Sequence, residues 1–255
     1  GGFIETSAAK VDLNGIRVRT RGGNWLIDPD GFTIAASGGD TTGATLSGNL
    51  SGGNISILSI GGLGSDGNIN VNDTVSWSAN TLTLTATNDV NINAVMTASN
   101  TASLDLAPGS NKVNVGFNPD GSFKGRIDFP GRSGIGFLTI NGNSYTVVTS
   151  LGAAVNATTL STPTTLQGIG YGGGSNLTGH FALGYDIING SDTALWNWGT
   201  VSGGGVGYGG FTPIGTNVGT GTQFTGTFDG LGHTITGLKS NRVATSTYPG
   251  GLFGY

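Results

Sequence analysis

Histidine and carboxylate side chains are the groups of this sequence that could perform acid–base or metal chemistry. The two histidines, His180 and His233, are far apart, and no metal-binding motif surrounds either. Acid-catalysed polysaccharide cleavage needs several acids, or acids with Lys or Arg, converging in one groove. The middle of the chain instead carries single aspartates, mostly beside Gly or Asn, at Asp66, Asp73, Asp89 and Asp105. This pattern is typical of turn capping, and we predict no catalytic residue.

Other aspartates belong to turn sequences. Asp28 and Asp30 lie in Asp-Pro-Asp-Gly, and Asp120 lies in Asn-Pro-Asp-Gly. Pro presets φ in such turns, and Gly accepts a positive φ. Turn carboxylates can bind Ca²⁺, but the Gly-Gly-x-Gly-x-Asp repeat of calcium-binding proteins is absent. We therefore predict neither a metal nor a cofactor.

Aromatic and asparagine side chains are the candidates for carbohydrate contact and attachment. A sugar-stacking surface would use Trp196, Trp198 and Tyr208, together with Tyr171 and Tyr185. The alternative is that these rings cap the ends of the fold. Asn-x-Ser/Thr sequons give candidate glycan-attachment sites at Asn49, Asn72, Asn156, Asn176 and Asn189. A sixth sequon begins at Asn54, which heads a predicted strand and is expected to be less accessible.

The composition narrows the class of protein. Gly fills 50 of 255 positions, and only 9% of residues are charged, against about 25% in ordinary globular domains. The net charge of −4 argues against nucleic-acid binding, since the largest basic group is Arg17, Arg19 and Arg21, on one predicted strand. Cysteine is absent, which excludes disulfides. No apolar run reaches the length of about 18 residues that a membrane-spanning helix needs.

Short runs of alternating apolar and polar residues predict half-buried strands between Asn54 and Leu106. These runs recur at a steady step: Ile69 to Val90 is 21 positions, Leu82 to Leu104 is 22, and Val90 to Val113 is 23. Two strands per step at this period indicate stacked coils. Ile69, Val71, Val90, Ile92, Leu104, Leu106, Val113 and Val115 are expected inside, and Asn70, Asn91 and Asp105 outside.

We therefore predict an all-β fold, a right-handed parallel β-helix, with the hand taken from the general rule for parallel crossovers. Residues 1–118 would form coils that begin with short strands, including Val11–Leu13 and Gly15–Arg19, and contain an irregular segment at 38–53. Residues 119–176 would continue the helix. They would add an extra-helical hairpin at 137–148, turning at Asn141-Gly142. Residues 177–255 would be Gly-rich coils.

Two stretches carry a family resemblance. Gly2-Phe3-Ile4-Glu5-Thr6-Ser7 with Trp25-Leu26-Ile27-Asp28-Pro29 resembles the repeat region of filamentous-haemagglutinin-type exoproteins, the large bacterial adhesins of two-partner secretion. Phe224–Leu238 and Gly251–Tyr255 resemble the Gly-Leu-rich "GLUG" repeat of secreted bacterial adhesins and proteases. The resemblance agrees with the predicted hand. The resemblance also implies that the sequons could carry glycans, because some adhesins of this family are glycosylated at such sites.

The resemblance implies a stalk segment of a secreted, surface-associated adhesin rather than an enzyme. The expected partners are host-cell or matrix carbohydrate or protein, and an outer-membrane secretion partner for the parent protein. Two alternatives remain, a filament subunit that assembles through its coil ends and a carbohydrate-active β-helix enzyme. The chain starts without Met and ends within a repeat-like motif, so we expect a piece whose last coil, with Leu252 and Phe253, is completed by further repeats or by another molecule.

Overall fold

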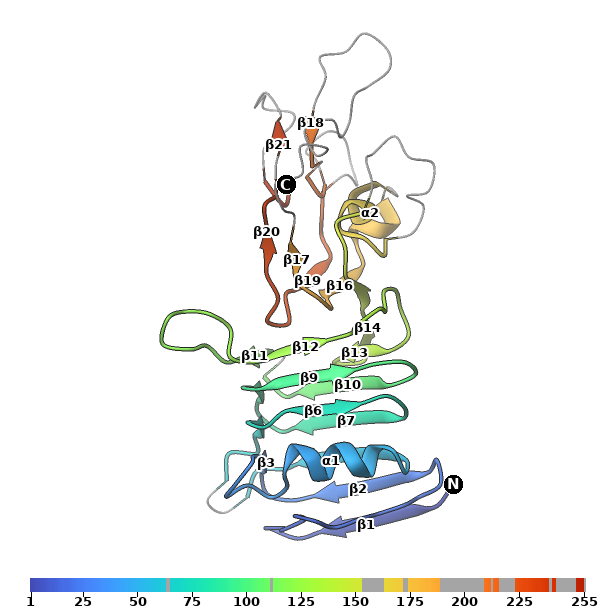
Figure 1. Cartoon of the computed structure of the whole chain (residues 1–255), viewed down its shortest axis with the longest axis vertical. Coiled ribbons are helices and arrows are strands. Elements are labelled where there is room, and N and C mark those ends of the chain that lie inside the picture. Colours follow the sequence, from blue (N-terminus) through green and yellow to red (C-terminus); the bar gives the residue numbers. More distant parts are fainter. Residues whose placement is uncertain are drawn as a thin grey trace. The chain divides into compact units, whose positions relative to one another are not determined.

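The computed structural model describes residues 1–62, 65–110, 112–152, 163–171, 174–188, 209–211, 213–215, 223–238, 240–241 and 251–254. Its contacts divide the chain into two units, 1–145 and 146–255. In the described residues of both units, most of the regular elements are short β-strands, as Figure 1 shows, so the prediction of an all-β protein is confirmed.

The first unit contains three sheets. A seven-stranded sheet has the order β1-β2-β4-β7-β10-β13-β14 and is made of Phe3–Ser7, Asn24–Asp28, Asn54–Ser59, Thr81–Ala86, Ser103–Pro108, Leu138–Ile140 and Asn143–Ser144. A second has the order β11-β8-β5-β3 and is made of Val113–Val115, Val90–Ile92, Ile69–Val71 and Phe32–Ile34. A third has the order β12-β9-β6 and is made of Arg126–Asp128, Val95–Ala98 and Val75–Trp77. Every pairing in them is parallel except that of β13 with β14.

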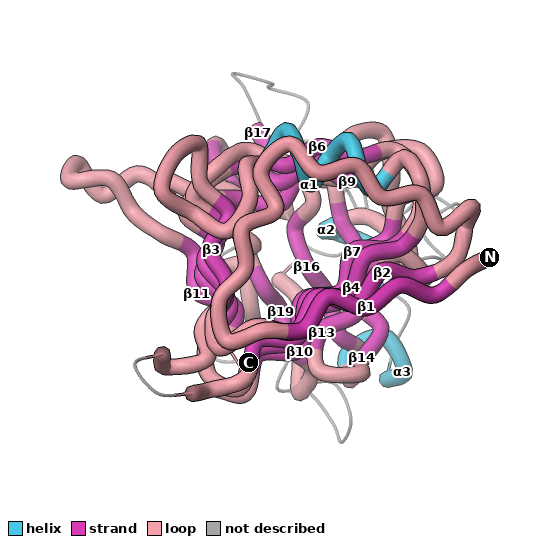
Figure 2. Tube along the Cα trace, turned by 90° about the horizontal axis from the view of Figure 1, so that it is seen from below, coloured by secondary structure: helices cyan, strands magenta, loops and turns pink. Residues whose placement is uncertain are grey.

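The register of these sheets follows the step predicted from the sequence. Leu104 pairs with Leu82, and Val90 pairs with both Ile69 and Val113. Each step carries three strands rather than the predicted two, because a strand of the third sheet follows each strand of the second in the middle coils (Figure 2). The missed strands β6 and β9 are no shorter than β5 and β8, and Thr74–Ser78 alternates in the same way as Asn68–Asn72, so the sequence did carry a signal for β6.

The apolar side of each strand forms the core of this unit. Ile69, Val71, Val90 and Ile92 are completely buried, and Leu104 and Leu106 are at most 1% exposed, as predicted. Val113 and Val115 also occupy the inward row, in register with Val90 and Ile92, but they are only half-buried. Their strand β11 is the last of its sheet, so no further strand covers them on one side.

Residues 38–53 contain helix α1, Gly43–Leu50, where an irregular segment was expected. Thr42 caps it, because its Oγ1 accepts a hydrogen bond from the Thr45 amide at 3.1 Å. Leu46 and Leu50 are buried, and the helix packs beside β6 and β4 (Figure 1). The Ser76 amide of β6 donates to the Ser47 hydroxyl of the helix at 2.9 Å. The helix thus covers the edge of the third sheet where another strand would otherwise pair.

Two further predictions for the first unit need correction. Val11–Leu13 and Gly15–Arg19 are not strands, so the three arginines at 17, 19 and 21 do not share a strand face. The hairpin turn is present, with Asn141 at φ 49° and Gly142 at φ 75°. Only two register pairs join β13 to β14, however, and β13 also pairs in parallel with β10. The first arm is therefore part of the main sheet and not an addition outside it.

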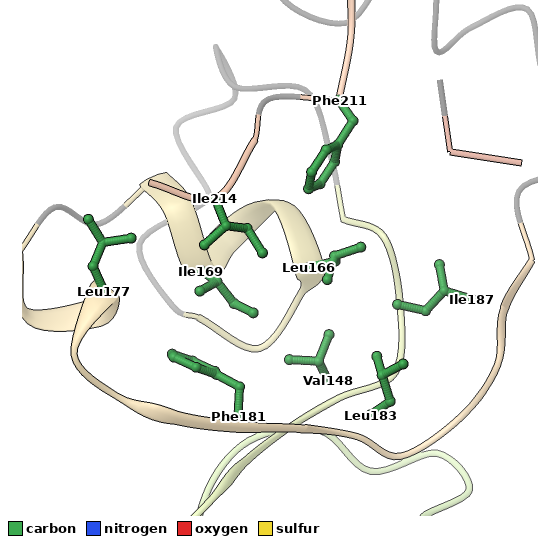
Figure 3. Packing of buried hydrophobic residues seen from close by; sticks show 9 residues of the cluster. All are labelled: Val148, Leu166, Ile169, Leu177, Phe181, Leu183, Ile187, Phe211 and Ile214. Carbon is green, nitrogen blue, oxygen red and sulfur yellow. The ribbon is translucent and has the colours of Figure 1, made fainter. Parts of the chain in front are cut away.

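The described part of the second unit has small sheets and two short helices. Strands β15 Thr146–Val148, β16 His180–Leu183 and β19 Thr227–Asp229 pair in parallel, as do β17 Ile187–Ile188 and β20 Ile235–Thr236. Strand β18 Gly209–Gly210 pairs antiparallel with β21 Ser240–Asn241. The two helices, α2 Leu166–Tyr171 and α3 Gly174–Leu177, lie where no helix was expected. Figure 3 shows the core, built from Val148, Leu166, Ile169, Leu177, Phe181, Leu183, Ile187, Phe211 and Ile214.

The last described residues pair within this unit. Phe253 forms a parallel bridge with Ile214, whose amide donates to the Leu252 carbonyl at 2.9 Å. The Phe253 ring lies 5.0 Å from the ring of Phe224 and 5.6 Å from that of Phe228. This segment therefore has a neighbour of its own chain on one side. Its completion by a second neighbour stays a prediction.

Candidate functional site

A ladder of side-chain amides runs across the outer face of sheet β3-β5-β8-β11. Apolar residues point inward from these strands, so Thr33, Asn70, Asn91 and Asn114 point outward in register. The Asn91 Nδ2 donates to Asn70 Oδ1 at 2.8 Å, and the Asn114 Nδ2 donates to Asn91 Oδ1 at 3.1 Å. Asn70 Nδ2 in turn lies 3.5 Å from Thr33 Oγ1. We call these four residues the amide ladder.

A second, shorter row runs beside the amide ladder. The Asn93 Nδ2 donates to Asn72 Oδ1 at 2.9 Å. Gly116 takes the third position of this row. A Cβ there would collide with Asn93 Oδ1, so a side chain at this position would displace the Asn93 amide. The face is therefore a dense array of amides whose orientation is fixed by their own hydrogen bonds.

A polar hollow lies at the β3 end of this face. Its volume is about 780 Å³, and Thr33, Asn68 and Asn70 are among the residues that line it. Three carboxylates, those of Asp30, Asp40 and Asp66, and one ammonium group, that of Lys10, also line it. We call it the acidic hollow. In the described part of the chain, no three His, Asp or Glu side chains lie close enough together to hold a metal ion.

Hydrogen bonds fix two of the three carboxylates in the acidic hollow. Asp40 Oδ2 accepts a hydrogen bond from the Thr33 amide at 2.7 Å. Asp66 accepts from the Asn68 amide at 3.3 Å and from Asn68 Nδ2 at 2.6 Å. The prediction that Asp66 caps a turn is therefore correct. No sequence pattern indicated that three aspartates from separate loops would line one hollow.

An exposed aromatic pair lies at the opposite, β11 end of the sheet. Phe117 and Phe123 face each other across an antiparallel bridge in the loop between β11 and β12, with ring centroids 4.9 Å apart. Phe117 is 61% exposed and Phe123 is 37% exposed. The predicted turn closes this loop, because the Gly121 amide donates to the Asn118 carbonyl at 2.9 Å. The loop projects from the sheets in Figure 1.

The candidate glycosylation sites differ in accessibility. Asn49 is buried, its Oδ1 accepts from the Val18 amide at 2.7 Å, and its Nδ2 donates to the Ile16 carbonyl at 2.9 Å. A glycan cannot attach there without breaking this packing, so that prediction was wrong. Asn72 is exposed, while Asn176 is half-buried in α3. Asn54 is half-buried, in line with its expected lower accessibility. Asn156 and Asn189 lie outside the described residues.

Three of the aromatic residues proposed for sugar stacking, Trp196, Trp198 and Tyr208, also lie outside the described residues. Tyr185, a further candidate, is exposed and stands 6.5 Å from the ring of His233 in a stacked arrangement. Sequence reasoning missed the Phe117–Phe123 pair. Its signal was a pair of aromatic residues flanking an Asn-Pro-Asp-Gly turn, one directly before Asn118 and one two positions after Gly121.

The two histidines have different partners, and His233 lies beside a carboxylate. His180 Nδ1 lies 2.6 Å from the Thr227 hydroxyl, and His233 is buried with its Nδ1 3.4 Å from Asp186 Oδ1. Partial burial raises the pKa of Asp186, but hydrogen bonds from Thr234 and the charge of His233 outweigh it and hold that pKa below its usual value. Burial raises the pKa of Asp229, with partial compensation by a hydrogen bond from the Leu231 amide.

Comparison of the chain with protein-family models, with curated proteins and with solved structures found no match. None of the helices in the described ranges is long and apolar enough to cross a membrane. The function must therefore be argued from the fold and from the side chains described above.

Proposed function

We propose that residues 1–145 form a right-handed parallel β-helix and that the chain is a stalk segment of a secreted bacterial surface adhesin. One observation carries this proposal. Three sheets of mainly parallel strands keep their apolar rows aligned from strand to strand, and four of the pairings in the middle coils repeat at steps of 21 to 23 residues. The step from β9 to β12 is 31 residues, because the loop between β11 and β12 is longer. A chain that repeats one register in three sheets stacks its coils and can be extended without redesigning its core.

The surface of the first unit supports a mechanical and adhesive role. Outward positions carry Asn, Ser and Thr, and the amide ladder ties neighbouring strands together through their side chains. With few charges on it, such a surface depends little on salt for its stability. The proposal assigns the chain no catalytic step. It places the parent protein outside the bacterial cell, exported through an outer-membrane partner, as the resemblance to two-partner-secretion adhesins implies.

Attachment of coated beads tests the adhesive role. Beads that carry the 255-residue chain should be retained on host cells, extracellular matrix or isolated matrix polysaccharide, and beads that carry an unrelated β-rich protein should not. Equal retention of both kinds of bead would contradict the proposal. Incubation of the chain with pectin and alginate tests the enzyme alternative, and release of new reducing ends or unsaturated products would support it.

A filament-forming subunit is the second candidate, and the outer edge of β1 favours it. Ile4 occupies the same inward row as Trp25, Ile55 and Leu82, yet Ile4 is 39% exposed while these three are at most 3% exposed. Strand β1 pairs only with β2, so its other edge offers unpaired backbone groups. Pairing of another strand there would bury Ile4.

Sedimentation tests this second candidate. The chain should self-associate with rising concentration, and Ile4→Lys should reduce association because a charge would then face the joining strand. Glu5→Lys changes the charge of the outward neighbour and serves as the control. A strictly monomeric wild-type chain would exclude assembly through β1.

A further inference from the structure

We propose that the outer face of sheet β3-β5-β8-β11 binds an uncharged, hydroxyl-rich polysaccharide that lies along the direction in which the strands stack. The acidic hollow would receive one end of the bound segment, and the Phe117–Phe123 pair would contact the other. This inference rests on the adhesive role proposed above and names its ligand class. The hollow adjoins β3 and the aromatic pair follows β11, the two outer strands of this sheet, and the amide ladder joins them across β5 and β8.

The amide ladder has the hydrogen-bonding capacity that sugar hydroxyls require. The Asn91 side chain donates one hydrogen bond to Asn70 and accepts one from Asn114. A side-chain amide has two N–H donors and two acceptor lone pairs, so one donor and one acceptor of Asn91 remain for a ligand. A hydroxyl group both donates and accepts, and therefore matches this pair. Because the ladder already holds the amide in place, binding a sugar would cost little side-chain entropy.

The spacing of the ladder suits a polymer rather than a single sugar. Neighbouring strands lie about 4.8 Å apart, so the outward amides repeat at this interval along the stack. This interval is close to the length by which one pyranose ring advances an extended β-1,4-linked chain. A bound polysaccharide could therefore place one sugar over each of several successive amides. The weak contacts would add up along the face.

The charge of the acidic hollow selects against anionic polymers. Of the residues that line it, three carry a carboxylate and one carries an ammonium group. A sulfated or uronic-acid polymer would bring further negative charge to Asp30, Asp40 and Asp66 and would be repelled. Hydroxyl groups can instead donate to the free carboxylate oxygens, since Asp40 uses only Oδ2 to accept the Thr33 amide. The expected ligand is therefore uncharged.

The aromatic pair provides an apolar contact at the β11 end. Phe117 follows β11 after a single residue, Gly116, and the bridge to Phe123 fixes the backbone on both sides. The faces of pyranose rings carry C–H groups that pack against aromatic rings, whose faces bear partial negative charge. Exposed rings on a turn with its own hydrogen bonds are pre-positioned for this contact. The Phe117 ring is the more exposed of the two and should contribute more.

Affinity electrophoresis of the whole 255-residue chain tests the inference. Gels would contain xylan, mannan or hydroxyethyl cellulose as uncharged polymers, and alginate or heparin as anionic polymers. We expect at least one uncharged polymer to retard the chain and neither anionic polymer to do so. Retardation by heparin or alginate alone, lost on adding salt, would overturn the assignment of the ligand class. Absence of retardation by every uncharged polymer would overturn it as well.

Substitutions locate the binding face. Asn91→Ala and Phe117→Ala should each weaken binding by about tenfold, because each removes one good contact. Thr83→Ala, on the outward side of β7 in the seven-stranded sheet, is the matched control and should bind like wild type. Phe117→Ala is not expected to disturb the fold, because the Phe117 ring is exposed and lies outside the amide ladder. The melting temperature of each variant is measured to check that it folds. Wild-type binding by both face variants would overturn the proposal.

The two proposals can fail separately. If coated beads attach to host cells or matrix but no uncharged polymer retards the chain, the adhesive role stands and the proposed ligand is wrong. Retardation by an uncharged polymer that survives both face substitutions would keep the ligand class and move the site elsewhere. Failure of bead attachment with retardation intact would show that the polysaccharide is bound for another purpose.

Discussion

At the scale of single residues, the side of the strand decides what a position tolerates. Val71 is completely buried and pairs in register with Ile34 and Ile92, whereas Asn70 beside it joins the amide ladder. A shift of one residue would exchange these environments. The alternation in the sequence was therefore enough to predict which side chains are buried in the middle strands. Burial is incomplete where the neighbouring strand is missing, as at Val113.

Val71→Asp should lower the free energy of unfolding by about 4 kcal/mol, because it buries a carboxylate in an apolar core without a charge partner. Ser76→Asp is the control, since Ser76 is exposed on the outward side of β6. Chemical denaturation followed by circular dichroism measures both. Equal stability of Val71→Asp and wild type would refute the inward placement of Val71.

Two aspartates of the second unit should change stability with pH in opposite directions. The raised pKa of Asp229 means that its favourable contribution is present below its ordinary pKa of about 4 and is lost as the pH rises through the raised value. Asp229→Asn should therefore melt higher than wild type at pH 7, and this difference should shrink on acidification. Asparagine keeps an oxygen that can accept from the Leu231 amide.

The lowered pKa of Asp186 gives its contribution to stability the opposite pH dependence. Its contribution is present above the ordinary pKa and is lost as the pH falls through the lowered value. Asp186→Asn should melt below wild type at pH 7, with a difference that also shrinks on acidification. Thermal melts across this pH range compare both variants with wild type. Differences of the same sign for both variants would contradict these pKa assignments.

At the scale of elements, local sequence explained the long strands and missed those elements that depend on their neighbours. Four of the eight residues of helix α1, two glycines, a threonine and a serine, have low helix propensity. Its place is set by packing against β6 and β4 and by the Thr42 cap. The hollow could not be predicted either, because Lys10, Asp40 and Asp66 come together only once the coils stack. The recurring Asn70, Asn91 and Asn114 were visible, but their mutual hydrogen bonds were not.

The hairpin turn and helix α1 give glycine substitutions of opposite sign. Gly142 has φ 75° with open space around it, so Gly142→Ala should cost roughly 1 kcal/mol through backbone strain alone. Gly142→Asn should cost less, because asparagine tolerates this conformation. Gly48 is exposed in α1 with open space where an alanine methyl group would lie, and Gly48→Ala should stabilise by about 0.5–1 kcal/mol. Denaturation midpoints with unchanged slopes would measure these effects. Stabilisation by Gly142→Ala would contradict the turn conformation.

At the scale of the whole molecule, the two units are built in different ways. The first repeats one register through three sheets, and the second buries a compact cluster that includes Leu166, Phe181 and Phe211. The stalk proposal depends on the first unit, because only a repeating register lets coils be added or removed without disturbing the core. A stack of coils gains its stability mainly from contacts between nearest neighbours.

Deletion of one complete coil tests this claim most directly. Removing residues 81–102 deletes β7, β8 and β9, and would let β10, β11 and β12 pair with β4, β5 and β6 with the apolar rows still aligned. We predict that this shortened chain stays folded, rich in β-structure, and melts cooperatively. Removing residues 81–91 alone should abolish folding of the first unit, because the following strands would then fall into the wrong sheets. Loss of folding in both deletions alike would contradict the stacked-coil account.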